Sequence, residues 1–300
     1  MGSRNIALEA AAQLPAVPQR LASVPRRRIG AVRAARRLNR ASGLLALSVL
    51  ADSGLEHYRG QFKNPAMYTP LAVSSLALLA SLHGTTDRRR GAHRARDAVY
   101  ALSTVTSLVG FGFHLYNVGK RPGGYRTIGN FFYGAPIGAP WALSLAGLFG
   151  FASERVRDNP PGKRVTVFGL SAGRLLTLLS SGGLMGTVGE VGLLHFRGAF
   201  QNPAMYVPVT LPPVAAGALA GAAVAPSTRP LSRLLLRATA LMGFAGVAFH
   251  AYGVGRMMGG WRNWKQNVMD GPPLPAPPSF TGVALAGLAA LRLLEDHEDG

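Results

Sequence analysis

The stretch that decides the fold runs from His57 to Pro70 and reads HYRGQFKNPAMYTP. It returns, with ten of fourteen positions identical, as HFRGAFQNPAMYVP from position 195 to position 208. A match this dense within one chain indicates an internal repeat. In both copies an Asn-Pro pair opens the next apolar run. We expect Asn64 and Asn202 to cap a helix there, because Asn is a good N-cap and Pro suits a first helical turn.

A second block also occurs twice. It begins at Phe113 and again at Phe249, each time with a histidine as the next residue and a Gly-Gly pair starting ten residues after the phenylalanine. A weaker match joins the Pro/Gly runs at 134–140 and 271–278. The matches are offset by about 136–138 positions, so the chain consists of two copies of one unit.

Eight uncharged apolar runs lie between clumps of charge, four in each copy, at roughly 42–56, 66–84, 98–118, 136–152, 168–194, 204–225, 234–254 and 279–293. A membrane span needs about 17–25 apolar residues. An even number of spans returns the chain to its starting side, which makes the copies parallel. The sequence therefore predicts an all-α polytopic membrane protein. Its eight transmembrane helices form two parallel four-helix repeats related by a pseudo-two-fold axis along the membrane normal. We expect spans one and three to lie beside spans five and seven.

The basic residues orient the chain. It carries 32 Lys+Arg against 13 Asp+Glu, a net charge of +19, and 23 of the basic residues fall on the side that holds both termini. The positive-inside rule makes that side cytoplasmic. The predicted segments are a basic cytoplasmic arm (1–41), a first four-span repeat (42–152), a cytoplasmic linker (153–167), a second four-span repeat (168–293) and an acidic cytoplasmic tail (294–300).

The composition excludes several classes of protein. The chain has no cysteine, which excludes disulfides, thiolate-held metal clusters, c-type haem and a cysteine nucleophile. Charged residues make up only 15% of the chain, against about 25% in soluble domains. Because the basic residues gather at the ends of apolar runs, we expect contact with the lipid bilayer and no nucleic-acid partner.

The repeated blocks hold four of the seven histidines, and all four fall at the predicted outer ends of spans: His57, His114, His195 and His250. Asp52 and Glu190 match each other five residues before a repeated histidine, whereas Glu56 has no counterpart. Ionisable groups within spans are costly and are functional candidates by default. We therefore expect the four histidines to lie together as metal ligands, and the three acids to be catalytic or proton-carrying groups.

Four arginines accompany the histidines on the side that disfavours positive charge: Arg59, Arg126, Arg197 and Arg262. They are candidate cofactor-binding residues, because a guanidinium fork holds carboxylate or phosphate well. Three interpretations of the whole set stay open. It binds transition-metal ions, with iron or copper favoured over zinc. It holds a b-type haem by two histidines and the haem propionates by arginines. Or its members satisfy one another structurally.

The leading functional hypothesis is an integral membrane metalloprotein with an outward-facing His/carboxylate site between the repeats. It would act as a membrane oxidoreductase, or in electron transfer with a lipid-soluble substrate. We expect it in the bacterial cytoplasmic membrane, with a peripheral redox partner on the extracytoplasmic side. The alternatives are a transporter for a metal ion or small anion and a non-catalytic membrane anchor of an oxidoreductase complex. Enzymatic activity and oligomeric state stay open.

The topology yields a labelling prediction. Because the chain has no native cysteine, a single cysteine placed at Gln61 or Gly123 is the only labelling site. A membrane-impermeant maleimide should modify it in intact cells, and tags on both termini should react only after lysis. Labelling of Gln61 from the cytoplasm alone would overturn the orientation.

Overall fold

The computed structural model describes residues 26–160 and 163–298, with the side chains of residues 30–160 and 163–295. Most of the predicted basic arm (1–41) and most side chains of the predicted acidic tail (294–300) therefore lie outside the described part of the chain. Two residues of the predicted linker, 161 and 162, lie outside it as well.

Eight long helices account for the eight apolar runs, one helix to each run. They are α2 (Arg26–Arg59), α3 (Thr69–Thr86), α4 (Arg94–Gly119), α6 (Gly138–Asp158), α7 (Ala172–Arg197), α8 (Val207–Ala222), α9 (Arg229–Gly255) and α11 (Pro278–Glu298). The first helix extends well before its apolar run, so the described part of the basic arm is helical and continuous with α2.

Shorter elements that the sequence did not predict join these helices. They are the helices α5 (Gly129–Tyr133) and α10 (Trp264–Asp270), the 3₁₀ turns η3 (Pro65–Tyr68), η4 (Gly124–Arg126), η5 (Pro203–Tyr206), η6 (Pro226–Thr228) and η7 (Gly260–Asn263), and the strands β1 (Thr166–Val167) and β2 (Leu170–Ser171). The two strands pair antiparallel in a small hairpin. The rest of the described chain makes an all-α protein.

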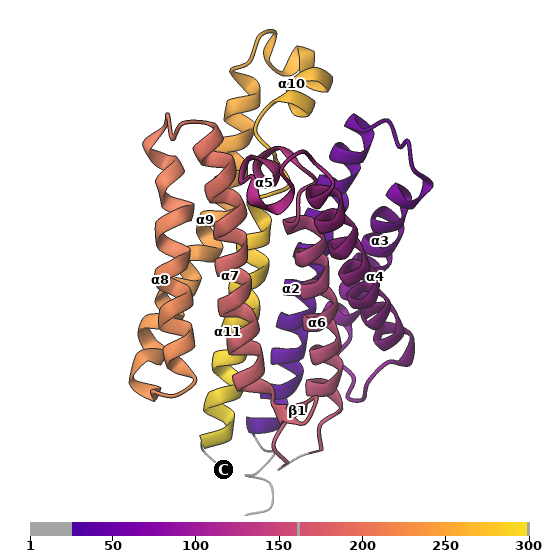
Figure 1. Cartoon of the computed structure of the whole chain (residues 1–300). Helices are drawn as coiled ribbons and strands as arrows, with labels where there is room; N and C mark the ends of the chain where they lie inside the picture. The colour runs from indigo at the N-terminus through magenta and orange to yellow at the C-terminus, as the bar shows by residue number, and fades with distance from the viewer. Residues whose placement is uncertain (1–25, 161–162, 299–300) are drawn as a thin grey trace, which may run out of the picture.

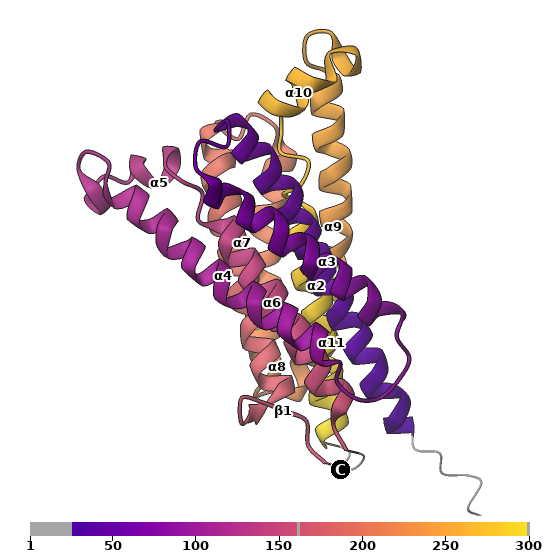
Figure 2. The same cartoon turned by 90° about the vertical axis from the view of Figure 1, so that its right-hand side faces the viewer.

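Four helices form an inner ring in which α2 packs on α6, α6 on α7, α7 on α11, and α11 on α2. The other four form two outer hairpins. Helices α3 and α4 cover α2 and α6, and helices α8 and α9 cover α7 and α11. Figures 1 and 2 show α5 and α10 at one end of the bundle and the β1 hairpin and C-terminus at the other. We call these the α5/α10 end and the β1 end.

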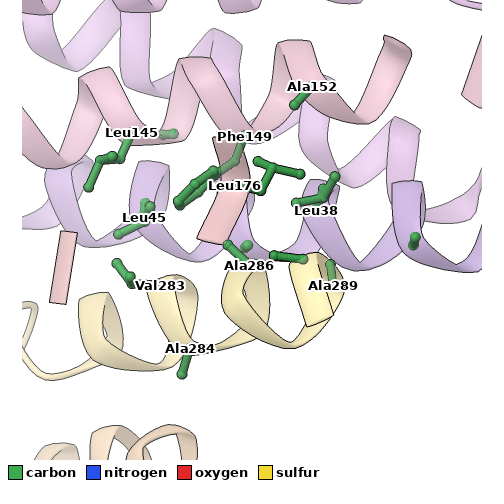
Figure 3. Close-up of a cluster of buried hydrophobic side chains, with 14 of the residues drawn as sticks. Leu38, Leu45, Leu145, Phe149, Ala152, Leu176, Val283, Ala284, Ala286 and Ala289 are labelled. Carbon is green, nitrogen blue, oxygen red and sulfur yellow. The ribbon is translucent and has the colours of Figure 1, made fainter. Parts of the chain in front are cut away.

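The core lies where the inner helices meet. Figure 3 shows Leu38 and Leu45 of α2 beside Leu145 and Phe149 of α6, with side chains of α11 below them. Much of the buried surface of α11 is alanine, for example Ala286 with none of its surface exposed. Small side chains let helix backbones approach closely, which favours helix association within a bilayer.

The outer helices have a different character. Among the described residues, four helical stretches are long and apolar enough to cross a membrane: Pro65–Thr86, Arg94–Gly119, Pro203–Ala222 and Pro226–Gly255. These are the stretches that contain α3, α4, α8 and α9. Their outward surfaces are apolar, as at Leu79 and Leu241, which are 63% and 70% exposed. Apolar surface of this extent is unfavourable in water and suits lipid. The four helices indicate an integral membrane protein in contact with the bilayer.

The two halves of the chain meet differently from the sequence-based expectation. Spans one and three were expected beside five and seven. Instead the halves meet mainly through α2 with α11 and α6 with α7, which are the first with the eighth and the fourth with the fifth of the long helices. The fourth long helix of each half lies inside the bundle. Its small residues, such as Ala146 and Ala290, are fully buried and allow neighbouring helices to approach closely.

A buried ion pair distinguishes the first half at the β1 end. The guanidinium of Arg96 donates to both carboxylate oxygens of Glu154, at 2.9 and 2.8 Å, and also to Asp87 at 3.0 Å. The Arg96 and Glu154 side chains are 2% and 0% exposed. The matched positions of the second half hold Ser232 and Leu291. The ion pair therefore joins α4 to α6 in the first half, and the second half has no equivalent pair at the matched positions.

This asymmetry yields a stability prediction. Arg96→Met removes the closest cationic partner of Glu154 and leaves the buried carboxylate with Arg157, whose Nε lies 3.9 Å away. The loss should cost up to about 3–5 kcal/mol of unfolding free energy. Adding Glu154→Leu removes the stranded charge and should recover part of that loss. Unfolding in mixed micelles by added SDS measures both variants. As a control, Arg233→Gln breaks the half-exposed pair with Glu295, and it should cost at most about 1 kcal/mol. A double variant no more stable than Arg96→Met would contradict the account.

Candidate functional site

The first histidine lies at the C-terminal end of α2, at the α5/α10 end of the bundle. After the helix ends, Gln61 and Phe62 both adopt the left-handed conformation, with φ of 58° and 48°. The chain reverses there, and the Phe62 N–H donates to the carbonyl of His57 at 3.0 Å. Asn64 then caps η3 by accepting from a backbone N–H, as its sequence context predicted. The Met67 carbonyl comes to lie 2.6 Å from His57 Nδ1.

The second half builds the same arrangement at the end of α7. Ala199 and Phe200 are left-handed, with φ of 54° and 46°. Asn202 caps η5, with backbone angles equal to those of the first cap. The Met205 carbonyl lies 2.8 Å from His195 Nδ1. Left-handed non-glycine residues are uncommon. Two consecutive ones at matched places indicate that the turn geometry belongs to the repeated motif.

The other two histidines are held by the Pro/Gly runs. His114 Nδ1, on α4, is hydrogen-bonded to the carbonyl of Pro136, just before α6. His250 Nδ1, on α9, lies 2.7 Å from the carbonyl of Pro273, before α11. The weak match between these two runs therefore corresponds to a shared hydrogen bond.

All four imidazoles thus share one hydrogen-bond arrangement. A carbonyl oxygen only accepts, so each Nδ1 carries the proton and donates, and a neutral ring keeps its lone pair on Nε2. Metal-ligating histidines are commonly oriented in this way, with one ring N–H donated to a backbone carbonyl. Each side chain is half-buried near the α5/α10 end. The four rings are therefore preoriented, each with one nitrogen available to a ligand.

The histidines associate in pairs within each half. His57 and His114 lie close enough to interact electrostatically, and so do His195 and His250. Among the described residues, no group of three or more His, Asp and Glu side chains is arranged to hold a metal ion. The expectation that all four histidines lie together as metal ligands stays a prediction.

The two matched acids lie within electrostatic range of each other, one in each half. Asp52 and Glu190 are half-buried and close enough to interact electrostatically. The Glu190 carboxylate accepts the backbone N–H of Gly138, the first residue of α6. A carboxylate at a helix N-terminus is stabilised by the helix dipole. Glu190 therefore has a structural role, since it joins α7 of one half to α6 of the other.

The arginines and the unmatched acid have separate environments. Arg59 forms an ion pair with Glu56 on its own helix. Arg197 donates to the carbonyl of Phe132 at 3.3 Å and lies over the Tyr133 ring, so it contacts α5 of the other half. The remaining two predicted residues are exposed on η4 and η7: Arg126 and Arg262. The four predicted arginines share no common partner among the described residues.

Sequence reasoning missed the atoms that orient the rings, because they are backbone carbonyls and leave no side-chain signature. It also missed Asn130 and Asn267, which are buried and each donate to two carbonyls of the Gly-Gly loop of their own half. Asn130 and Asn267 are separated by about the same number of residues as the neighbouring repeated positions. This spacing could have identified them as part of the repeat. They brace the loop next to the second histidine of each half.

No protein-family model, no curated protein and no solved structure matches this chain.

The contact of Glu190 with α6 yields a prediction. A Cβ added at Gly138 would lie 1.3 Å from Glu190 Oε2, so Gly138→Ala should cost about 1–3 kcal/mol through overpacking. Adding Glu190→Ala should relieve the clash. Gly189→Ala is the control, because a Cβ there meets nothing within 4 Å. Thermal unfolding in detergent measures all three. If Gly138→Ala and Gly189→Ala unfold at the same temperature, the contact is absent.

Proposed function

We propose that this chain is an eight-span protein of the bacterial cytoplasmic membrane, with both termini in the cytoplasm. Its halves are two parallel four-helix repeats related by a two-fold axis along the membrane normal. In each half a histidine pair near the extracytoplasmic surface binds a transition-metal ion, iron or copper. The protein acts in redox chemistry, as an oxidoreductase or electron carrier for a lipid-soluble substrate or for a peripheral partner on the outer side.

Helix contacts support the repeat. Within the first half α2 packs on α3 and α6, α3 on α4, and α4 on α6. Helices α7, α8, α9 and α11 make the same set of contacts in the second half. The contacts between the halves follow the same correspondence. The first long helix of one half packs on the fourth long helix of the other, as α2 on α11 and as α7 on α6.

Burial explains why, among the described residues, only the four outer helices carry an apolar stretch long enough to be recognised as a membrane span. The four inner helices pack against neighbours on several sides and expose less of their surface to lipid. Polar residues such as Asn39 and Ser144 are then tolerated, since they are fully buried and hydrogen-bonded. The shortest inner helices have 21 residues, a length of about 31 Å, which matches a hydrocarbon core of about 30 Å.

The single observation that carries the functional proposal is the matched set of Nδ1–carbonyl hydrogen bonds. Ordinary packing does not require four separate imidazoles to present the same nitrogen. Bound iron or copper would supply one-electron chemistry, with solvent or substrate in the positions that two histidines leave open. The chain contributes ring orientation, partial shielding from water, and the neighbouring carboxylates Asp52 and Glu190, each of which can hold and release a proton.

A b-type haem is the second candidate, and the pairing favours it. A haem takes its remaining ligands from the macrocycle, so two axial imidazoles are enough. The absence of a three-residue ligand group among the described residues is compatible with this. Visible absorption separates the two cases, because a bis-histidine haem gives an intense Soret band and a bound copper or non-haem iron ion does not.

Metal content of the detergent-purified protein tests the proposal. We expect two equivalents of bound iron or copper per chain, one for each histidine pair. His57→Ala or His114→Ala should remove one equivalent, and His195→Ala or His250→Ala should remove the other. Helix content by circular dichroism should stay unchanged, because the bundle is held by packing spread over eight helices.

The inner histidines provide the matched control. His83 and His93 lie at the other end of the bundle, exposed, with ring centroids 5.3 Å apart, and neither belongs to a repeated block. Alanine at either position should leave metal content unchanged. Metal loss confined to these two variants, or full occupancy in all four outer variants, would contradict the proposal. In that case the outer imidazoles only satisfy the loops.

A further inference from the structure

A concave cluster of arginines lies at the β1 end, where α2 of the first half packs on α11 of the second. The cavity is small, about 190 Å³, and is lined by Ala34 and five arginines: Arg33, Arg36, Arg37, Arg40 and Arg292. It is at the opposite end of the bundle from the histidine pairs, so the proposed metal site does not account for it.

Helix geometry explains how the arginines converge. The four on α2 follow one another at spacings of three, one and three residues, which places them on one face of the helix. Because α2 packs on α11, the fifth arginine joins them from the other half. Arg36 donates to the Thr85 carbonyl at 2.6 Å and Arg37 to the Leu288 carbonyl at 3.4 Å. These bonds hold two of the guanidinium groups in place.

Within the described side chains, no acidic group balances the positive charge of the cluster. Among the described side chains no carboxylate forms an ion pair with any of the five, and none lines the cavity. The nearby acid Glu295 pairs instead with Arg233. Burial, followed by the charges of Arg292 and Arg40, lowers the pKa of Arg37. Like charges held together in this way repel one another, and an anion in the cavity would relieve that repulsion.

We propose that this arginine cavity binds a phosphate group and thereby joins the two halves of the protein. Several guanidinium forks directed at one small cavity suit the oxygens of a phosphate, each of which accepts more than one N–H. The group belongs either to the headgroup of an anionic phospholipid or to a free phosphate in solution. Basic pockets between helices at the cytoplasmic surface are suited to lipid headgroups.

Two sets of charge-matched variants test the proposal on the full chain. The cavity variant combines Arg33→Gln, Arg40→Gln and Arg292→Gln, whose side chains make no hydrogen bond to another described residue. The control variant combines Arg88→Gln, Arg90→Gln and Arg94→Gln, which are exposed at the same end of the bundle. Both variants lose the same charge, so only the cavity distinguishes them.

Binding is measured with two probes in a neutral detergent. The first is inorganic phosphate, followed by thermal unfolding at constant ionic strength with chloride as reference. The second is phosphatidylglycerol, followed by retention of the lipid in native mass spectrometry, with phosphatidylcholine as reference. Wild type should bind at least one probe. The cavity variant should lose affinity by about tenfold or more, because hydrogen bonds to charged groups are lost, and the control should change by less than about threefold.

Each pattern of results either identifies the ligand of the arginine cavity or contradicts the proposal. Response to phosphatidylglycerol alone identifies a lipid headgroup, and response to inorganic phosphate identifies a soluble ligand. Lysine at the three cavity positions keeps the charge and removes the forks, so it should bind more weakly than wild type and more tightly than glutamine. Equal losses in the cavity and control variants would show a diffuse charge effect and overturn the proposal. So would binding of neither probe by wild type.

Discussion

Close backbone approach among the inner helices is the constraint on which the rest of the structure depends. A Cβ at Gly282 of α11 would lie 3.1 Å from the Ala41 carbonyl of α2, and one at Gly173 of α7 would lie 3.0 Å from the Leu294 nitrogen of α11. Within a bilayer this kind of contact, rather than the hydrophobic effect, holds helices together. The inner ring sets where each helix ends, and the helix ends set where each imidazole meets its carbonyl.

The chemistry at the α5/α10 end follows from that placement. Four rings on four helices are each fixed by a carbonyl from a following loop or turn, so ring orientation depends on the loops as much as on the helices. The same end holds the matched acids Asp52 and Glu190, one from each half. The other end differs between the halves, since only the first contains the buried Arg96–Glu154 pair. The two halves therefore match at the α5/α10 end and differ at the β1 end.

The sequence predicted the helices well, because apolar runs and Asn-Pro caps are local signals. Each run corresponds to one long helix, and Asn64 and Asn202 cap as expected. It did not predict the left-handed turns at Phe62 and Phe200, since those residue types do not favour positive φ. Nor did it predict the backbone carbonyls that orient the four histidines, because a carbonyl leaves no side-chain signature. A repeat predicts equivalent positions but not the distance between them.

X-ray absorption at the metal edge of the purified protein tests the central claim most directly. The account predicts a first shell that contains two imidazole nitrogens per metal ion, recognised by outer-shell scattering from the rings, with oxygen in the remaining positions. Replacing His57 should reduce the averaged imidazole contribution or the metal content. A first shell of oxygen alone, imidazole scattering unchanged in variants of all four outer histidines, or no metal edge at all would contradict the account.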